Sequence, residues 1–171
     1  LAMNTLLATR GTTSLTLRTI ARQSGVSTSS LLHHYGSREH LLRVGAHRTG
    51  RARQQSIDRR LAWEGPLAFL PADEDDLLDA AAWLAWCELW RTEEGLQRTV
   101  RDARVNELGL LAHATGQPWG SDDLQRTASL VEGLVIAMCA PVEPLDAVRA
   151  RTLLAQHLGL TDEREVDRSG G

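Results

Sequence analysis

The chain has 171 residues, of which 42% are hydrophobic, and a formal net charge of −3. That length holds one globular core, or a module of about 50 residues joined to a domain of about 110. No apolar run reaches the roughly 20 residues that a membrane-spanning helix needs, and no secretory leader pattern opens the sequence, so we expect a soluble, cytoplasmic protein with no membrane partner.

The charge is distributed unevenly along the chain. Residues 1–60 contain ten arginines against Glu39 and Asp58, a balance of +8, whereas residues 61–171 have a balance of −11. Such a contrast favours a polyanion-binding N-terminal segment followed by an acidic, solvated remainder.

The first 61 residues carry the signals for four helices. Apolar residues at helical spacing in "LAMNTLLATRG" predict the first, and a hydroxyl residue able to cap a helix N-terminus precedes each of the others. The second helix is expected to carry Leu17, Ile20 and Ala21, with its cap at Thr16 or Ser14 and its end at Gly25. The third is expected over 28–35 with its cap at Ser27, and the fourth from 38 to about 61 after Ser37; Gly11 can end the first.

The second and third predicted helices are joined by a short turn. Ala21 is small enough for the third helix to cross closely, and Gly25 can adopt the positive φ of a sharp turn. Val26 and Leu31 are expected to form the apolar side of the third helix. The residues left to project away from the core are then Thr28, Ser29, Ser30 and His33.

This arrangement is that of a helix-turn-helix, whose outward helix enters a DNA major groove. An ordinary pair of packed helices would show the same small and apolar residues. The positive charge of the segment, which attracts phosphates, and the short polar side chains, which can approach base edges, favour DNA binding.

A pattern of spaced residues runs from Thr16 to Leu41. Its members are Thr16, Arg18, Ile20, Ala21, Gly25, Val26, Ser27, Leu31, His34, Tyr35, Ser37, Arg38, Glu39 and Leu41. The segment resembles the TetR family of transcriptional regulators, with Tyr35 and Arg38 as conservative exchanges. Leu32 departs from the pattern, because the family commonly has a tyrosine there whose hydroxyl meets a phosphate.

The resemblance implies a set of DNA contacts for this segment. The residues expected to meet bases are Thr28, Ser29, Ser30 and His33, with Arg18 able to bind a guanine through two hydrogen bonds. The residues expected to meet phosphates are Thr16, Ser27, His34 and Arg38. For His33 and His34 a plain surface or packing role is the alternative.

The long fourth helix carries Arg43, Arg48, Arg51, Arg53, Arg59 and Arg60. A charge run of this kind is usually a solvated face; the resemblance implies that this helix also links the DNA-reading head to the body. Gly65, Pro66 and Pro71 then mark a loop. We expect a DNA-binding domain over 1–45, a helical regulatory and dimerisation domain over 46–160, and a flexible tail over 161–171.

A nearly all-apolar helix is expected over 77–90, where Trp83, Trp86 and Trp90 share one face. Three large rings are difficult to pack without gaps, so the stripe is a candidate wall of a ligand pocket, although plain core filling is the alternative. Polar groups for this pocket could come from Glu88, Arg98, Arg101, Asp102 and Asn106.

The last two helices are expected at about 122–140 and 144–158. Leu124, Ala128, Val131, Val135 and Met138 form a stripe on the first, while Leu145, Val148, Thr152 and Leu153 begin one on the second. In the family that the sequence resembles, two such helices pair with their two-fold mates, which implies a homodimer with an isologous interface.

The remaining chemistry-bearing residues give little support for catalysis or metal binding. The acids at 73–76 have no accompanying histidine, and Cys87 and Cys139 sit in apolar runs that predict buried, reduced thiols. An enzyme using Glu88, Asp102 and His113 would lack a nucleophile or an orienting partner. We therefore expect neither a metal, a cofactor nor a catalytic site.

The sequence thus predicts an all-α, dimeric regulator, a repressor that binds a pseudo-palindromic operator in double-stranded DNA and is released by a small effector. The effector is expected to be apolar or aromatic. A protein-interaction module that keeps the fold without binding DNA is the remaining alternative, which the Leu32 departure makes conceivable.

Overall fold

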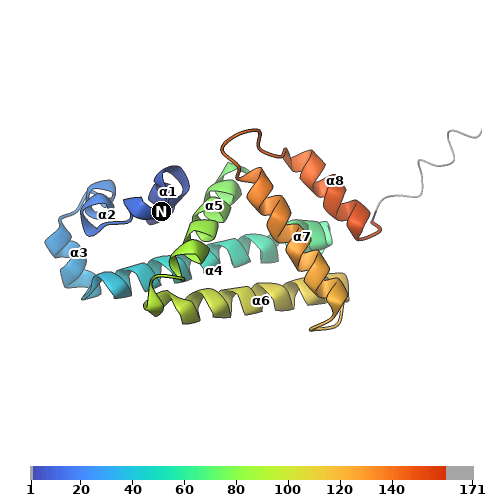
Figure 1. Cartoon of the computed structure of the whole chain (residues 1–171), viewed down its shortest axis with the longest axis horizontal. Helices are drawn as coiled ribbons and strands as arrows, with labels where there is room; N and C mark the ends of the chain where they lie inside the picture. The colour runs from blue at the N-terminus through green and yellow to red at the C-terminus, as the bar shows by residue number, and fades with distance from the viewer. Residues whose placement is uncertain (1, 161–171) are drawn as a thin grey trace, which may run out of the picture.

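The computed structural model describes residues 2–160, which form eight α-helices, three short 3-10 helices and no strand (Figure 1). The elements are α1 Ala2–Arg10, η1 Thr12–Ser14, α2 Leu17–Ser24, α3 Thr28–Tyr35, α4 Arg38–Glu64, η2 Gly65–Phe69, α5 Glu74–Leu89, η3 Glu94–Leu96, α6 Gln97–Thr115, α7 Asp122–Met138 and α8 Ala147–His157. The expected all-α class is confirmed. The predicted tail over 161–171 lies outside the described residues.

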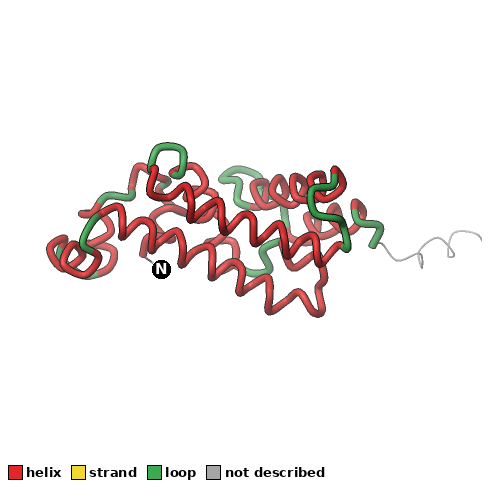
Figure 2. Tube along the Cα trace, turned by 90° about the horizontal axis from the view of Figure 1, so that it is seen from below, coloured by secondary structure: helices red, strands yellow, loops and turns green. Residues whose placement is uncertain are grey.

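The long helix α4 organises the molecule. It has 27 residues and therefore a length of about 40 Å at 1.5 Å per residue. Figure 1 shows α1, α2 and α3 gathered around its first turns, whereas α8 lies toward its far end. Helix α6 runs alongside α4, and α5 and α7 cross the pair, so the molecule is elongated, as the view in Figure 2 also shows.

Side-chain caps begin the helices at the predicted hydroxyl residues. Thr16 accepts a hydrogen bond from the Thr19 amide at 3.2 Å, and Ser27 accepts one from the Ser30 amide at 3.0 Å. Ser37 accepts one from the His40 amide at 3.1 Å. Gly25 ends α2 with φ 68° and ψ 25°, the left-handed conformation that glycine adopts without steric cost.

Two apolar clusters fill the interior. One lies among α1 to α4 and takes in Trp83 and Trp86 of α5 and Val100 of α6. The other joins η2, α6, α7 and α8 around Phe69, Leu134 and neighbouring residues. Helix α5 therefore packs on the N-terminal helices while it also belongs to the body, so the N-terminal helices and the body share a core.

A chain of buried polar contacts crosses the same junction. Trp86 Nε1 donates to Thr49 Oγ1 at 3.1 Å, Thr49 Oγ1 donates to Asn4 Oδ1 at 2.6 Å, and Asn4 Nδ2 donates to Asp79 Oδ1 at 2.7 Å. These bonds link α5, α4 and α1. Because buried polar groups are costly when unpaired, the chain fixes the orientation of the three helices.

The arginines of α4 do not form a simple solvated face. Arg53 reaches Glu107 of α6 at 2.8 Å with a side chain only 11% exposed. Arg60 is also largely covered and binds Glu64 and Asp76. Part of the positive charge counted in residues 1–60 is therefore used inside the fold to join α4 to α5 and α6.

The acids at 73–76 and the two cysteines have structural positions. Asp73 caps α5 by accepting from the Asp76 amide at 2.8 Å, which explains the cluster without a metal. Both cysteines are free, as predicted, but their side chains are only partly buried. Cys87 sits beside a cavity, and Cys139 follows the last residue of α7.

Candidate nucleic-acid interface and cavity

The third helix presents a polar surface at the end of the molecule. Leu31 is its buried residue and anchors it to the core, as predicted. Around it, Thr28, Ser29, Ser30 and His33 are exposed. These four residues predicted to meet bases therefore share one solvent-accessible helix.

Val26 differs from the prediction. We expected it on the buried side of α3, but its side chain is 45% exposed. Val26 precedes the Ser27 cap, in the turn itself, where its amide bonds to the Ala21 carbonyl at 3.0 Å. This bond holds the backbone in place and leaves the side chain at the rim of a shallow surface groove with Ser29, Ser30 and His33.

The residues predicted to meet phosphates have several local partners. The Thr16 and Ser27 hydroxyls already cap α2 and α3, and Ser27 Oγ lies 2.9 Å from Ser30 Oγ. His34 is exposed and meets the Tyr35 ring edge-on, with centroids 4.6 Å apart. Arg18 is exposed on α2, so it remains accessible to a base.

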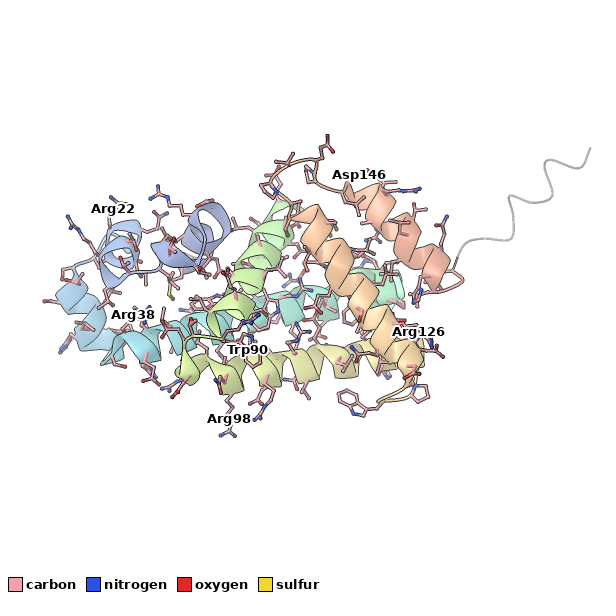
Figure 3. The ribbon with its side chains drawn as sticks, viewed as in Figure 1. Arg22, Arg38, Trp90, Arg98, Arg126 and Asp146 are labelled. Atoms are coloured by element: carbon pink, nitrogen blue, oxygen red, sulfur yellow. The ribbon has the colours of Figure 1, made fainter. Side chains whose placement is uncertain are left out.

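Arg38 is paired with the body. Its Nη1 atom lies 2.9 Å from Glu93 Oε1, at the turn between α5 and α6. Figure 3 labels Arg38 at the start of α4, close to the segment that joins α5 to α6. A DNA phosphate would compete with Glu93 for this guanidinium. The predicted DNA contact would therefore break the ion pair between Arg38 and Glu93.

A cavity of about 210 Å³ lies in the body between α5, α6 and α7. Phe69, Trp83, Leu108, Leu111 and Val131 are among its mostly apolar lining residues. Its polar lining residues are Arg53, Arg104, Glu107, Gln125, Ser129 and Glu132, with Cys87 beside them. An apolar hollow with a few convergent polar groups is typical of a small-molecule site.

Two ion pairs dominate the electrostatics of this cavity. Arg53 binds both carboxylate oxygens of Glu107, at 2.8 and 3.4 Å, and Arg104 binds both of Glu132, at 2.6 and 3.0 Å. The hydrogen bonds from Arg104 lower the pKa of Glu132. Burial raises the pKa of Cys87, which keeps that sulfur a neutral thiol rather than a nucleophilic thiolate.

Residues 2–44, which include α1, α2 and α3, match the family model of the bacterial regulatory proteins of the tetR family. This segment of the chain is therefore similar to the N-terminal domain of the TetR family. The match covers the capped helix-turn-helix described above, so α1, α2 and α3 are similar to the DNA-binding unit of this family.

Solved structures support the same fold along most of the chain. A TetR-family transcriptional regulator from a Rhodococcus species shares 20% sequence identity with it, covers 93% of each chain and gives a TM-score of 0.70. A transcriptional regulator from Rhodococcus sp. Rha1 has 16% identity and a TM-score of 0.78, over 93% of this chain and 91% of the other.

A third similar structure is a transcriptional regulator from Saccharomonospora viridis in complex with choline. It has 18% identity and a TM-score of 0.76, and 92% of each chain is covered. Among curated proteins, the sequence comparison found no match.

The predicted tryptophan stripe is split by the tertiary structure. Trp83 lines the cavity, as expected, but Trp86 is fully buried against α1 and α4, where its ring nitrogen binds Thr49. Trp90 follows the last residue of α5 and is 42% exposed (Figure 3). Trp83 and Trp86 belong to the same apolar cluster, but only Trp83 also borders the cavity.

The polar residues expected in the pocket lie outside this cavity. Glu88, Arg98, Asp102 and Asn106 are all exposed and do not line it. Arg98 points away from the body in Figure 3, and Asp102 pairs with Arg98 and Arg101 on its own helix. The prediction chose the wrong residues of α6, because the side chains of this helix that line the cavity include Arg104, Glu107 and Leu108.

Sequence reasoning missed the two ion pairs. A signal for one was present, since Glu132 is a lone carboxylate inside the apolar run "SLVEGLVIAM". A charge in such a run is rare without a partner. Its partner on another helix could not be read from the sequence.

The residue set considered for an enzyme is not assembled. Asp102 and His113 stand on one helix, eleven residues apart, which places them about 16 Å from each other along the axis. Glu88 is exposed on α5. Within residues 2–160, no cluster of three or more metal-ligating side chains is present and no helix is long and apolar enough to cross a membrane.

Proposed function

We propose that this protein is a TetR-family repressor that binds a two-fold-related operator as a dimer and is released when a small molecule occupies the cavity. The observation that carries the proposal is the position of α5. One part of this helix lines the cavity, and another packs against the N-terminal helices that hold the exposed recognition helix.

Reading of DNA is assigned to α3 and the start of α2. The short side chains of Thr28, Ser29 and Ser30 allow α3 to approach base edges closely, and Arg18 can bind a guanine. In a dimer, two copies of α3 would enter successive major grooves about 34–36 Å apart, or a multiple of that distance.

Dimerisation is assigned to the outer faces of α7 and α8. The inner stripe of α7, which includes Leu124, Val131, Val135 and Met138, is buried within its own chain. The opposite surface carries Ile136, which is 52% exposed, and Gly133, while Val148 of α8 is 76% exposed. A second copy of the same helices would cover these apolar groups in an isologous interface.

Gly133 supports a close approach of a partner helix. Among the described residues, no neighbouring atom lies within 4 Å of the position that a Cβ atom would take there. Packing within one chain therefore does not require a glycine at position 133. A helix of a second copy could use the space at short distance.

Release by a ligand is assigned to the cavity and α5. Trp83 contacts the cavity, and Trp86, three residues later, holds Thr49 of α4 and through it Asn4 of α1. A ligand that prefers a shifted α5 would change the position of the N-terminal helices, whereas equal affinity for both arrangements would shift nothing. A coupling of about 1–3 kcal/mol is ordinary for such proteins. That a protein of similar fold is in complex with choline supports a small-molecule role.

The experiment selects bound sequences from a random DNA pool with the purified chain, then measures affinity by gel shift at several salt concentrations. We expect an enriched site with two-fold symmetry and a binding constant that falls steeply with salt. A protein-interaction module of this fold would show no DNA affinity even at low salt. That result would contradict the proposal.

A further inference from the structure

The cavity contains charged side chains but no unbalanced charge. Its arginines and carboxylates, among the lining residues, are Arg53, Arg104, Glu107 and Glu132. Each arginine binds both oxygens of one carboxylate. The four formal charges therefore cancel within the site.

The two pairs differ in position. The pair between Arg53 and Glu107 joins α4 to α6 and is largely covered. The pair between Arg104 and Glu132 bridges α6 and α7, with side chains 50% and 43% exposed. A polar group that enters the cavity from solvent therefore meets the pair between Arg104 and Glu132 first.

A ligand with a net charge would have to displace one partner of a pair. A carboxylate that took Arg104 would leave Glu132 without its partner, and an ammonium group that took Glu132 would leave Arg104 unpaired. Breaking a two-point, charge-assisted contact in a partly desolvated site is unfavourable. An uncharged ligand meets no such cost, because it can use the rings and aliphatic groups and leave both pairs closed.

The volume of the cavity limits the size of the ligands that fit. An apolar cavity of about 150 Å³ accepts benzene, and this one has about 210 Å³. It suits a molecule of one or two fused rings. Phe69 and Trp83 supply aromatic walls, and the nearby Ser129 and Gln125 can bond a polar atom of the ligand.

We propose that the cavity selects uncharged aromatic molecules of one or two rings, and that the ion pair between Arg104 and Glu132 excludes their charged analogues. The inference rests on the proposed function, in that the cavity is taken as the effector site. The inference adds the chemical class of the effector, and it names the ion pair between Arg104 and Glu132 as the feature that selects this class.

Three probes that share one ring system but differ in net charge test the proposal. Indole is neutral, indole-3-acetate carries a carboxylate and tryptamine carries an ammonium group at pH 7. Titration calorimetry with the full chain gives the affinity of each. We expect indole to bind the unaltered protein about tenfold or more tightly than either charged probe.

Two substitutions should remove the expected selectivity, each for one charged probe. Glu132→Gln leaves Arg104 without its carboxylate, so indole-3-acetate should gain about tenfold over indole. Arg104→Gln leaves Glu132 unpaired, so tryptamine should gain instead by a similar factor of about ten. Glu94→Gln, at an exposed position outside the cavity, is the matched control and should keep the order of the unaltered protein. Circular dichroism confirms that each variant is folded.

The outcomes separate the ligand class from the regulatory role. The proposal is overturned if a charged probe binds the unaltered protein as tightly as indole, if none of the three binds, or if the two variants keep the same order of affinities. A gel shift with the selected operator gives an independent readout. If indole binds tightly but does not release the operator, the proposed release mechanism is contradicted. The proposed ligand class would still stand.

Discussion

Arg38 donates a hydrogen bond from Nη1 to Glu93 Oε1 over 2.9 Å and so joins the first turn of α4 to the turn between α5 and α6. The resemblance assigns the same guanidinium to a DNA phosphate. If Arg38 does bind DNA, its guanidinium has two alternative anionic partners, Glu93 in the body and a phosphate on DNA. Because exposed ion pairs contribute about 0–1 kcal/mol, a phosphate can compete with Glu93.

Removing the carboxylate should favour DNA. In Glu93→Ala, Arg38 has no partner in the body, so we expect affinity for any DNA sequence to rise severalfold, with the salt dependence unchanged because Arg38 reaches the same phosphate in both proteins. Glu94→Ala removes a neighbouring exposed carboxylate and serves as the control. Gel-shift titrations at several salt concentrations measure both quantities. Equal behaviour of the two variants would argue against competition for Arg38.

Two arginines of the N-terminal helices should have different roles on DNA. Arg38→Ala should weaken binding to all sequences and flatten the salt slope by about one unit, whereas Arg18→Ala should relax the preference at one base pair. Affinities for the selected operator and for its single-base variants distinguish the two effects. If both variants lost affinity in the same way, the assignment of base and phosphate contacts would be wrong.

The buried polar chain should matter for stability. Thr49→Val keeps the side-chain volume but leaves the Trp86 ring nitrogen and the Asn4 carbonyl oxygen without this partner. We expect the free energy of unfolding to fall by about 1–3 kcal/mol, since buried polar groups become unsatisfied. Urea denaturation measures it. Thr13→Val, at an exposed position, is the control and should change stability little.

The outer face of α7 should hold the dimer together. Ile136→Asp places a charge where a second copy would pack, so we expect a monomer by light scattering and a loss of operator binding at the same protein concentration. Trp119→Asp, an equally exposed apolar residue on the turn after α6, should stay dimeric. A monomeric unaltered protein, or a dimeric Ile136→Asp variant, would place the interface elsewhere.

The pair at the cavity should make stability depend on pH in the acidic range. Hydrogen bonds from Arg104 hold the folded pKa of Glu132 below its ordinary value of 4.5. As the pH falls through 4.5, the unfolded chain binds this proton before the folded chain does, so the stability that the pair contributes is present above that pH and is lost below it.

Comparison with Glu132→Gln isolates this contribution. The urea midpoint of the unaltered protein should exceed that of the variant at pH 7, and the difference should shrink as the pH falls from 5 to 3. Parallel pH profiles for the two proteins would show that the pair does not stabilise the fold.

The sequence by itself determined the N-terminal helices and most of their boundaries, although it left Thr16 and Ser14 as alternative caps of α2. Caps and stops act through bonds between residues three or four apart, so Thr16, Ser27 and Gly25 could be placed without any tertiary information. The exposed set on α3 followed in the same way, because helical periodicity and Leu31 fix which side faces the core.

Only the tertiary structure decided which residues of the body share a site. Trp83, Trp86 and Trp90 have helical spacing, yet one lines the cavity, one is buried against α1 and α4, and one lies past the helix end. Arg104 and Glu132 are on different helices, and their pairing depends on how α6 packs against α7. Helical periodicity specifies a face, but the neighbour on that face is set by contacts between segments far apart in the chain.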